Sequence, residues 1–473
     1  MNKIIKILLV SLVAFLPIHA ILITTMKCKF WFNTDIIRFW KELIISVLFI
    51  ITFVTTLKKY DWKFSRLYKN NYLLGTITAF GLCSFAFIFL PYLQPKLSSF
   101  LGFKYDVFFL IAFVIWMYLI QVKQSFNLLL KTLFSVTAWA LVIFLPWYLF
   151  WDISTVSSIF GFSSEVSTYN ANSCISFSQN VEWEHRFQGS FSGPIRWSVF
   201  LTVFFLVYLG YILKFLRNTD NKLFILPGKP KVWTTKYSDI SKALIVIPSL
   251  LVITSIFYSY SKTSVLWLFV WILLFAYLTF TIKYKKKLSP KYITIVWLIS
   301  LIPIGFVAIV KKDLFLHLWA VINRLDNLKM SVEMFLYNPI GYGLGIAGPA
   351  SWVWKSIESA WWTDIAIAST AITLRFLPEN WYVQILLEQW IIGLWLFMSV
   401  IIVIWLKLFT IVKKQRDFLS IWFFSSYITL LFMANFTHAF EESATSYIFF
   451  LLIWAYIAQN NLIKKHKNKK KKK

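Results

Sequence analysis

The chain has 473 residues, of which 59% are hydrophobic and only 14% are charged, and its mean hydropathy is +0.68. Average soluble domains carry about 25% charged residues, so the composition excludes an ordinary soluble enzyme and predicts an integral membrane protein. The formal net charge of +28 does not indicate nucleic-acid binding, because the basic residues cluster in short connections between apolar runs. That distribution is the orientation signal of membrane proteins.

Apolar runs of the length that a bilayer-spanning helix needs follow one another along the chain. They predict an all-α fold, a polytopic transmembrane helix bundle of about twelve spans. The first run has a signal-peptide-like start without a convincing cleavage site, so we expect it to be retained as a span. The predicted spans lie roughly at 4–25, 37–57, 73–93, 106–122, 129–150, 196–216, 243–260, 263–282, 292–310, 384–406, 417–436 and 444–461.

Lysine and arginine in the short connections predict the orientation of the spans. The basic stretches at 58–69 and 283–291 indicate cytoplasmic loops. This orientation places the N-terminus in the cytoplasm, and an even number of spans places the C-terminus there too. We expect the polybasic tail at 464–473 to lie against anionic lipid. Residues 1–463 are predicted to form a single polytopic membrane domain. Lysine and arginine between residues 27 and 41 weaken the rule around the first outer connection.

The sequence shows none of the common signatures of a cofactor or metal site. The three cysteines, Cys28, Cys83 and Cys174, form no CxxC motif and no cluster with histidine. The predicted topology puts Cys28 and Cys174 on the same side, but a bridge between them is not expected. A Walker loop, a dinucleotide fingerprint and an HExxH motif are also missing. We therefore expect any chemistry on the outer face.

Two outer segments, 151–195 and 311–383, are too long to be simple connections. Their aromatic residues, glycine turns and spaced charges favour a functional role, so they are predicted to form the active-site face. The second segment contains a helical pattern at 314–337 and the irregular joint "NPIGYGLGIAGP" at 338–349. By itself, "GYGLG" is more typical of a turn than of a phosphate cradle.

Basic residues on these outer segments are candidates for binding an anion. Arginine can hold a phosphate with two parallel hydrogen bonds, and lysine can hold it as a point charge. The alternative for those next to a span is an interfacial side chain that reaches toward a lipid headgroup. A weaker polar cluster, His438, Glu441 and Glu442, precedes the last span. The basic candidates are Arg186, Arg196, Lys262 and Arg324.

Residues 374–397, "LRFLPENWYVQILLEQWIIGLWLF", combine an apolar span with polar side chains that include Arg375, Glu379, Asn380, Gln384 and Glu388. In a helix, Asn380, Gln384 and Glu388 share one face, and ionisable residues within a span are expected to be functional. Glu379 in the first turn would suit the helix dipole. Alternatively, Glu379 acts as a general base beside a cationic pocket that includes Arg375.

Tryptophan is abundant and glycine is scarce. The chain has 24 Trp and 14 Gly, whereas glycine makes up about 7% of an average chain, or roughly 33 residues at this length. We hypothesise that some Trp positions are glycine in the source organism through a reassigned stop codon. The alternative is an aromatic-rich membrane protein, because Trp is enriched at membrane interfaces.

The order of the motifs resembles that of the O-antigen ligase and polymerase superfamily of bacterial polysaccharide enzymes. The resemblance covers most of residues 70–460 and is strongest in 182–201 and 323–400. Each motif is loose, and their order and spacing carry the signal. The motifs are "LGFKYDVFFLI", "RFQGSFSGPIRWSVFL", "SYSKTSVL", "YNPIGYGLG" and "ENWYVQILLEQWIIGLWLF".

The resemblance implies a metal-independent, inverting membrane glycosyltransferase without a cofactor, in the bacterial inner membrane. It would move a glycan from an undecaprenyl-diphosphate-linked donor to an acceptor hydroxyl of a glycan, lipid or protein on the outer face. Arg375, together with either Arg186 or Arg196, would hold the pyrophosphate, and Lys262 takes a place usually held by Arg. Glu379 stands where ligases have His, which favours a polymerase-like member.

Three functional alternatives remain at this level. The first is the polymerase or ligase itself. The second is a flippase or exporter of lipid-linked oligosaccharides, which would also need cations for a lipid pyrophosphate but should show internal repeats. The third is a structural scaffold of a secretion assembly, which does not explain the motif order. Within the resemblance, Trp390 occupies a position where the family usually has glycine.

Overall fold

The computed structural model describes residues 2–32, 37–59, 61, 72–89, 96–119, 125–150, 159–161, 179–181, 184–191, 193–218, 236–283, 318–347, 380–436, 440 and 442–471. Within these residues the protein is helical, with one short antiparallel hairpin of β1 (Gln179–Val181) and β2 (Glu184–Arg186). The predicted all-helical fold class is confirmed.

The helices of the first half are α1 (Asn2–Phe15), α2 (His19–Thr24), α3 (Trp40–Lys59), α5 (Tyr72–Ala86), α6 (Lys96–Leu119) and α7 (Ser125–Phe150). Those of the second half are α9 (Pro194–Asn218), α10 (Lys236–Tyr258), α11 (Lys262–Leu278), α14 (Leu318–Tyr337), α17 (Trp381–Gln415), α18 (Phe418–Met433) and α19 (Ser443–Lys471). Short 3₁₀ and π segments are η1 (Leu16–Ile18), η2 (Thr25–Lys29), η3 (Ile37–Phe39) and η4 (Thr279–Lys283).

Helix ends follow local signals in the sequence. The side chains of Asn380 and Asp417 accept backbone amide hydrogen bonds at the starts of α17 and α18, as good N-cap residues do. Proline at the start of η1 interrupts the first apolar run between α1 and α2. α17 ends at Arg416 in the left-handed conformation.

Six of the described helical stretches are long and apolar enough to cross a membrane: Ile4–Lys29, Trp40–Lys58, Phe126–Phe150, Pro194–Ile212, Lys262–Ile282 and Trp381–Gln415. Four shorter apolar helices accompany them: Tyr72–Ala86, Val246–Tyr258, Phe418–Met433 and Ser443–Ile457. A membrane protein is consistent with this, but the predicted count of about twelve spans is not confirmed. The span predicted at 292–310 lies outside the described residues.

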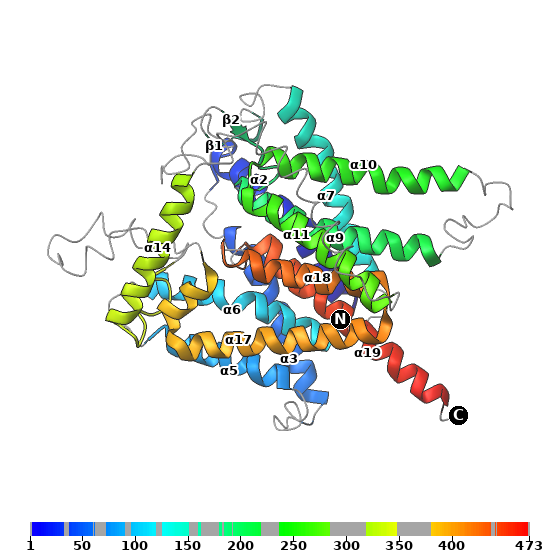
Figure 1. Cartoon of the computed structure of the whole chain (residues 1–473). Helices are drawn as coiled ribbons and strands as arrows, with labels where there is room; N and C mark the ends of the chain where they lie inside the picture. Colours follow the sequence, from blue (N-terminus) through cyan, green and yellow to red (C-terminus); the bar gives the residue numbers. More distant parts are fainter. Residues whose placement is uncertain are drawn as a thin grey trace.

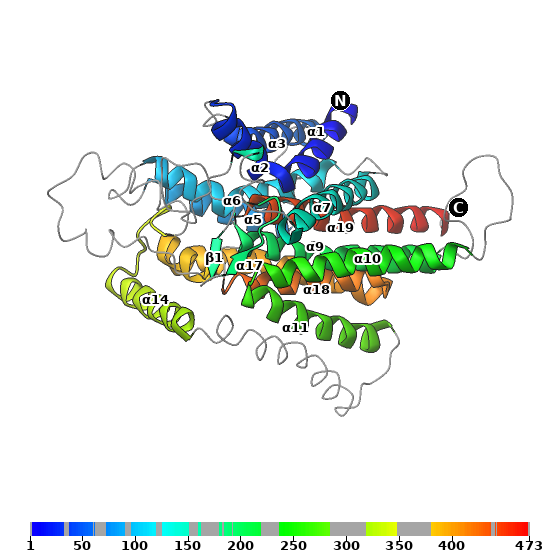
Figure 2. The same ribbon diagram turned by 90° about the horizontal axis from the view of Figure 1, so that it is seen from above.

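The long helices run side by side, with α14 at one end of the bundle and the C-terminus toward the opposite end (Figures 1 and 2). α18 packs along α9, α19 along α6, and α17 along α5. The α19 helix continues to Lys471, into the predicted polybasic tail. The predicted helical pattern at 314–337 corresponds to α14.

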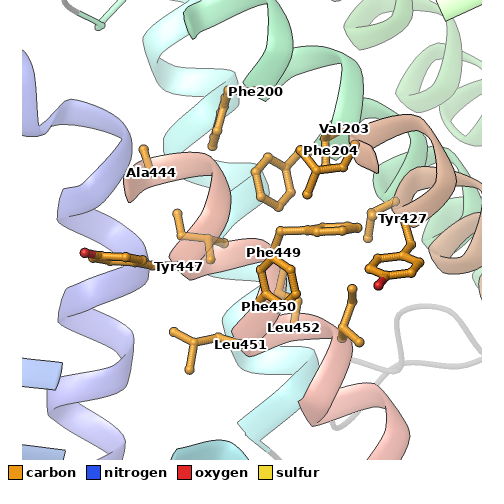
Figure 3. Close-up of a cluster of buried hydrophobic side chains, with 14 of the residues drawn as sticks. Phe200, Val203, Phe204, Tyr427, Ala444, Tyr447, Phe449, Phe450, Leu451 and Leu452 are labelled. Atoms are coloured by element: carbon orange, nitrogen blue, oxygen red, sulfur yellow. The ribbon is translucent and has the colours of Figure 1, made fainter. Parts of the chain in front are cut away.

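The core between α9, α18 and α19 is built largely from aromatic rings. Phe200 and Phe204 of α9 face Phe449 of α19, with Tyr427 of α18 beside them (Figure 3). Because lipid is as apolar as these side chains, close packing rather than exclusion from water stabilises such contacts. Gly210 permits the close approach of α9 to α18, since a Cβ there would lie 2.3 Å from the Trp422 ring.

One sequence prediction about cysteine is wrong. Cys28 is disulfide-bonded, and its partner lies outside the described residues, whereas Cys83 is a free thiol. The physical reason is a contact that the sequence does not reveal. Lys29 Nζ donates to the carbonyl of Ile159 at 2.7 Å, and a Cβ on Gly161 would lie 3.2 Å from Cys28 Cβ. The chain after α7 therefore reaches the end of the first apolar run.

Candidate functional site

Five charged side chains meet where several helices begin, and we name them the helix-end cluster: Lys41, Glu42, Lys104, Arg196 and Glu442. Lys104 Nζ lies 2.9 Å from Glu42 Oε1, and Arg196 Nε lies 3.4 Å from Glu442 Oε2. Lys41 interacts electrostatically with the other four. The cluster therefore holds three cations and two carboxylates.

Helix geometry makes this cluster favourable for an anion. Lys41 and Glu42 lie in the first turn of α3, Arg196 lies in the first turn of α9, and Glu442 directly precedes α19. The starts of helices carry partial positive charge and free amide groups, which attract anions and oppose cations. Cations in such places therefore need a carboxylate or a bound anion beside them.

Burial differs among the members of the helix-end cluster. The side chains of Glu42 and Lys104 are 7% and 16% exposed, whereas that of Arg196 is 52% exposed. The Glu42–Lys104 pair thus forms the inner part, and Arg196 is the guanidinium that an approaching ligand can reach. An exposed guanidinium can still rearrange to hold a phosphate with two hydrogen bonds.

His19 of α2 joins the inner part of this cluster to the first apolar run. Trp40 Nε1 donates to His19 Nδ1 at 2.9 Å, and Lys41 Nζ lies 2.8 Å from His19 Nε2. Indole nitrogen is only a donor, so Nδ1 is the acceptor in this pair. The start of α3 is therefore fixed against α2 by the Trp40–His19 hydrogen bond.

Two of the predicted basic residues, Arg186 and Lys262, lie on segments that contact each other. Arg186 Nε donates to the carbonyl of Ser259 at 2.9 Å, in the connection that leads to Lys262, the first residue of α11. Burial lowers the pKa of Arg186 to about 10, so the guanidinium remains charged at neutral pH. The structure thus brings the hairpin β1–β2 against the segment of Lys262.

The hydroxyl groups around Lys262 have structural partners. Ser264 Oγ lies 2.7 Å from Ser198 Oγ of α9 and 2.9 Å from Ser261 Oγ. Ser259 Oγ donates to the carbonyl of Ile256 at 2.6 Å. The Ser198–Ser264 pair joins α9 to α11, whereas the other two hydrogen bonds are local to the chain between α10 and α11. Arg324, the remaining basic candidate, lies on α14 and is half-buried.

The polar residues at 374–397 divide into different roles. Glu379 and Arg375, the predicted catalytic pair, lie outside the described residues. Asn380 caps α17, because its Oδ1 accepts from the amides of Tyr382 and Val383 at 3.0 and 3.2 Å. The α17 helix therefore begins at Trp381, three residues before the start of the span predicted at 384–406. Gln384, which precedes Glu388 by four residues in α17, is also buried.

Glu388 lies in a second polar group, which we name the carboxyl cluster: Ser84, Asp106, Glu388 and Gln389, all of them fully buried. Glu388 Oε1 accepts from the amides of Gly345 and Ala347 at 3.0 and 3.2 Å. Gln389 accepts from Ser84 Oγ at 2.7 Å and donates to Asp106 Oδ2. The cluster therefore joins α5, α6 and α17 to the glycine turn at 341–347.

The glycine turn is a packed turn, as its sequence predicts. Gly341, Gly343 and Gly345 have φ of +95°, +86° and +84°, which only glycine adopts readily. A Cβ on Gly345 would lie 2.3 Å from the Ser98 carbonyl oxygen, and one on Gly102 would lie 2.5 Å from the Gly345 nitrogen. The start of α6 thus lies directly against the turn.

Gly345→Ala is expected to destabilise the protein, because both the φ angle and the contact with α6 exclude a side chain. A strained backbone position of this kind costs about 1–3 kcal/mol. Gly75→Ala is the matched control, since nothing lies within 4 Å of its added Cβ inside α5, and a helical Gly→Ala change stabilises by roughly 0.5–1 kcal/mol. Thermal unfolding in detergent measures both; equal melting temperatures for the two variants would contradict the packed turn.

Sequence reasoning missed several members of the two clusters. Lys41, Glu42 and Lys104 were not singled out as candidates, and neither were Asp106 and Gln389. The sequence does contain a signal for Asp106, which is an acidic residue at the edge of a predicted span. Ionisable residues in spans are expected to be functional. Lys41 was noted only as an exception to the charge rule.

Comparisons with known proteins add no family. No protein-family model matches the chain, and a search of curated proteins finds no match either. The resemblance to the O-antigen ligase and polymerase superfamily therefore stays a hypothesis that rests on the order of the sequence motifs.

Proposed function

We propose that the protein is a membrane glycosyltransferase that transfers a glycan from an undecaprenyl-diphosphate-linked donor to an acceptor hydroxyl on the extracytoplasmic face. A polysaccharide polymerase is the preferred form, and an O-antigen ligase is the closest variant. The observation that carries the proposal is the helix-end cluster. It gathers Lys41, Lys104 and Arg196 from three helices beside two carboxylates.

The charges of this cluster match what such a transfer needs. A lipid diphosphate is a doubly charged leaving group, and preorganised cations stabilise the charge that develops on it. With both carboxylates ionised, the cluster keeps one positive charge in excess, and the starts of α3, α9 and α19 add partial positive charge. An incoming diphosphate can replace Glu442 as the partner of the exposed Arg196.

The proposed reaction is an inverting displacement. The acceptor hydroxyl oxygen attacks the anomeric carbon of the donor, the bond from that carbon to the diphosphate oxygen breaks, and undecaprenyl diphosphate leaves. A carboxylate takes the hydroxyl proton. Glu379 is the candidate from the motif order, and Glu442 is the candidate from the cluster geometry, because it is partly exposed beside Arg196.

The disulfide at Cys28 supports an extracytoplasmic position for the proposed site. Disulfides persist in oxidising compartments and are rare in the cytoplasm. Cys28 lies at the end of the first apolar run, and the next long helix in the chain is α3, which carries Lys41 and Glu42 of the helix-end cluster. This favours an extracytoplasmic position for the cluster.

The experiment uses the full chain, purified in detergent, with a lipid-diphosphate-linked oligosaccharide as donor. Formation of longer glycans supports a polymerase, and transfer to a different acceptor supports a ligase. Glu379→Gln and Glu442→Gln are compared in the same assay. Because loss of the base slows the transfer, the slower of the two variants identifies which glutamate is the base. Movement of the lipid-linked oligosaccharide across proteoliposomes without a new glycosidic bond would instead establish a flippase.

A further inference from the structure

The long helix α17 is broken in its first half, at a residue that the chain gives as tryptophan. Gln389 and Trp390 depart from helical geometry, and Trp390 has φ +59° and ψ −178°. That combination belongs to a backbone region that is essentially restricted to glycine. Prolines and glycine–serine pairs are the usual causes of a sharp kink, and residues 384–392 contain neither.

The break is a built feature of the fold. Beside it, the carbonyls of Leu387 and Glu388 accept from the amides of Tyr342 and Gly343 at 2.8 and 3.0 Å. A broken helix within a membrane protein needs such replacement donors for its backbone. A Cβ on Gly341 would lie 3.1 Å from the Trp390 nitrogen, so the turn lies directly against the break.

A second tryptophan occupies a glycine position. Trp31 follows Phe30, the C-cap residue of η2, and has φ +56°. The residue directly after a helix C-cap often adopts the left-handed conformation, and it is usually glycine. Its side chain is 87% exposed, so no buried contact favours tryptophan there. Among the residues that the structure describes, five non-glycine residues have positive φ, and two of them are tryptophans.

From these backbones and the excess of Trp over Gly in the composition, we propose that positions 31 and 390 carry glycine in the native protein, where a reassigned stop codon encodes it. The inference is independent of the proposed enzymatic function. Its consequence for the site is structural: glycine at 390 makes the break in α17 intrinsic to the chain, and the break holds Glu388 under the glycine turn.

Other tryptophans are expected to be genuine. Trp197 is fully buried, donates from Nε1 to Ser255 Oγ at 2.7 Å, and packs on Gly189, where a Cβ would lie 2.4 Å from its ring. The Ser255 hydroxyl and the missing side chain of Gly189 therefore accommodate an indole ring at this position. The recoding therefore applies to particular positions, and Trp197 supplies an internal control.

The first test is the mass of peptides from the protein isolated from its source organism. Glycine masses at positions 31 and 390, with tryptophan at 197, are the expected result. The codons should agree, with the reassigned triplet at 31 and 390 and the ordinary Trp codon at 197. A tryptophan mass at position 31 or 390 overturns the proposal there.

The second test uses recombinant protein and distinguishes the effect of the positive φ at position 390 from the effect of losing the indole ring. Trp390→Gly and Trp390→Ala both remove the indole, which packs half-buried beside Phe87, Ile88 and Leu344, but only glycine relieves the positive φ. We expect the glycine variant to have the higher melting temperature of the two, and Trp197→Gly to melt far below the unchanged chain. An alanine variant as stable as the glycine variant would overturn the backbone argument.

Discussion

Arg196→Ala is expected to lower the rate of glycan transfer by about 10²–10³-fold, because removing one preorganised donor from a developing negative charge has an effect of that size. Arg196 is the exposed guanidinium of the helix-end cluster and the one that a diphosphate reaches first. The rate is measured with purified protein and a lipid-diphosphate donor at saturating acceptor. Arg196→Lys should retain part of the activity, since it keeps the charge and loses the planar fork.

Two further variants distinguish binding from folding. Arg196→Gln combined with Glu442→Gln removes the ion pair without leaving Glu442 unpaired. Because it also removes a candidate base, it should be no more active than Arg196→Ala, while melting near the unchanged chain. Lys329→Ala removes a cation from an exposed pair on α14, and exposed pairs contribute little to stability. It should transfer at the normal rate. Normal transfer by Arg196→Ala would exclude an anion-binding role for this guanidinium.

Glu388→Leu is expected to cause the largest loss of stability among the substitutions considered. Glu388 Oε1 accepts from two buried amides, those of Gly345 and Ala347, and each buried amide left without an acceptor costs about 1–3 kcal/mol. The two together give about 2–6 kcal/mol, and the glycine turn should detach from α17. Thermal unfolding in detergent measures the loss.

Glu388→Gln is the matched comparison, because its amide oxygen can still accept from the turn while the charge is removed. We expect it to melt between the unchanged chain and Glu388→Leu. Glu333→Leu on α14 is the control, since Glu333 is 64% exposed and surface changes usually alter stability by about 0.5 kcal/mol or less. A Glu388→Leu variant that melts like Glu333→Leu would show that the turn does not depend on this carboxylate.

The helical nature of the fold follows from the sequence because apolar length is a local property. The span predicted at 384–406 lies within α17, and "GYGLG" was correctly predicted as a turn. The glycines themselves carry that information, since three positive φ angles need residues without a Cβ. The polar character of Gln384 and Glu388 within a span also marked them for attention.

The helix-end cluster could not be predicted because its members lie far apart in sequence. Lys41, Lys104 and Arg196 belong to three different helices, and only the packing of α3, α6, α9 and α19 brings them together. The break in α17 was equally hidden, because a tryptophan within an apolar run predicts an unbroken helix. The disulfide at Cys28 depends on a long-range contact of the same kind.

The hydrogen bonds around the glycine turn couple α14 mechanically to α17. The Tyr342 hydroxyl donates to the Met334 carbonyl near the end of α14 at 3.0 Å, while the Tyr342 amide donates to Leu387 in α17. A single residue therefore joins both helices. Any ligand that lifts α14 away from the bundle must strain the hydrogen bonds that hold the turn on Glu388, so a displacement at the end of the bundle is transmitted to the carboxyl cluster between the helices.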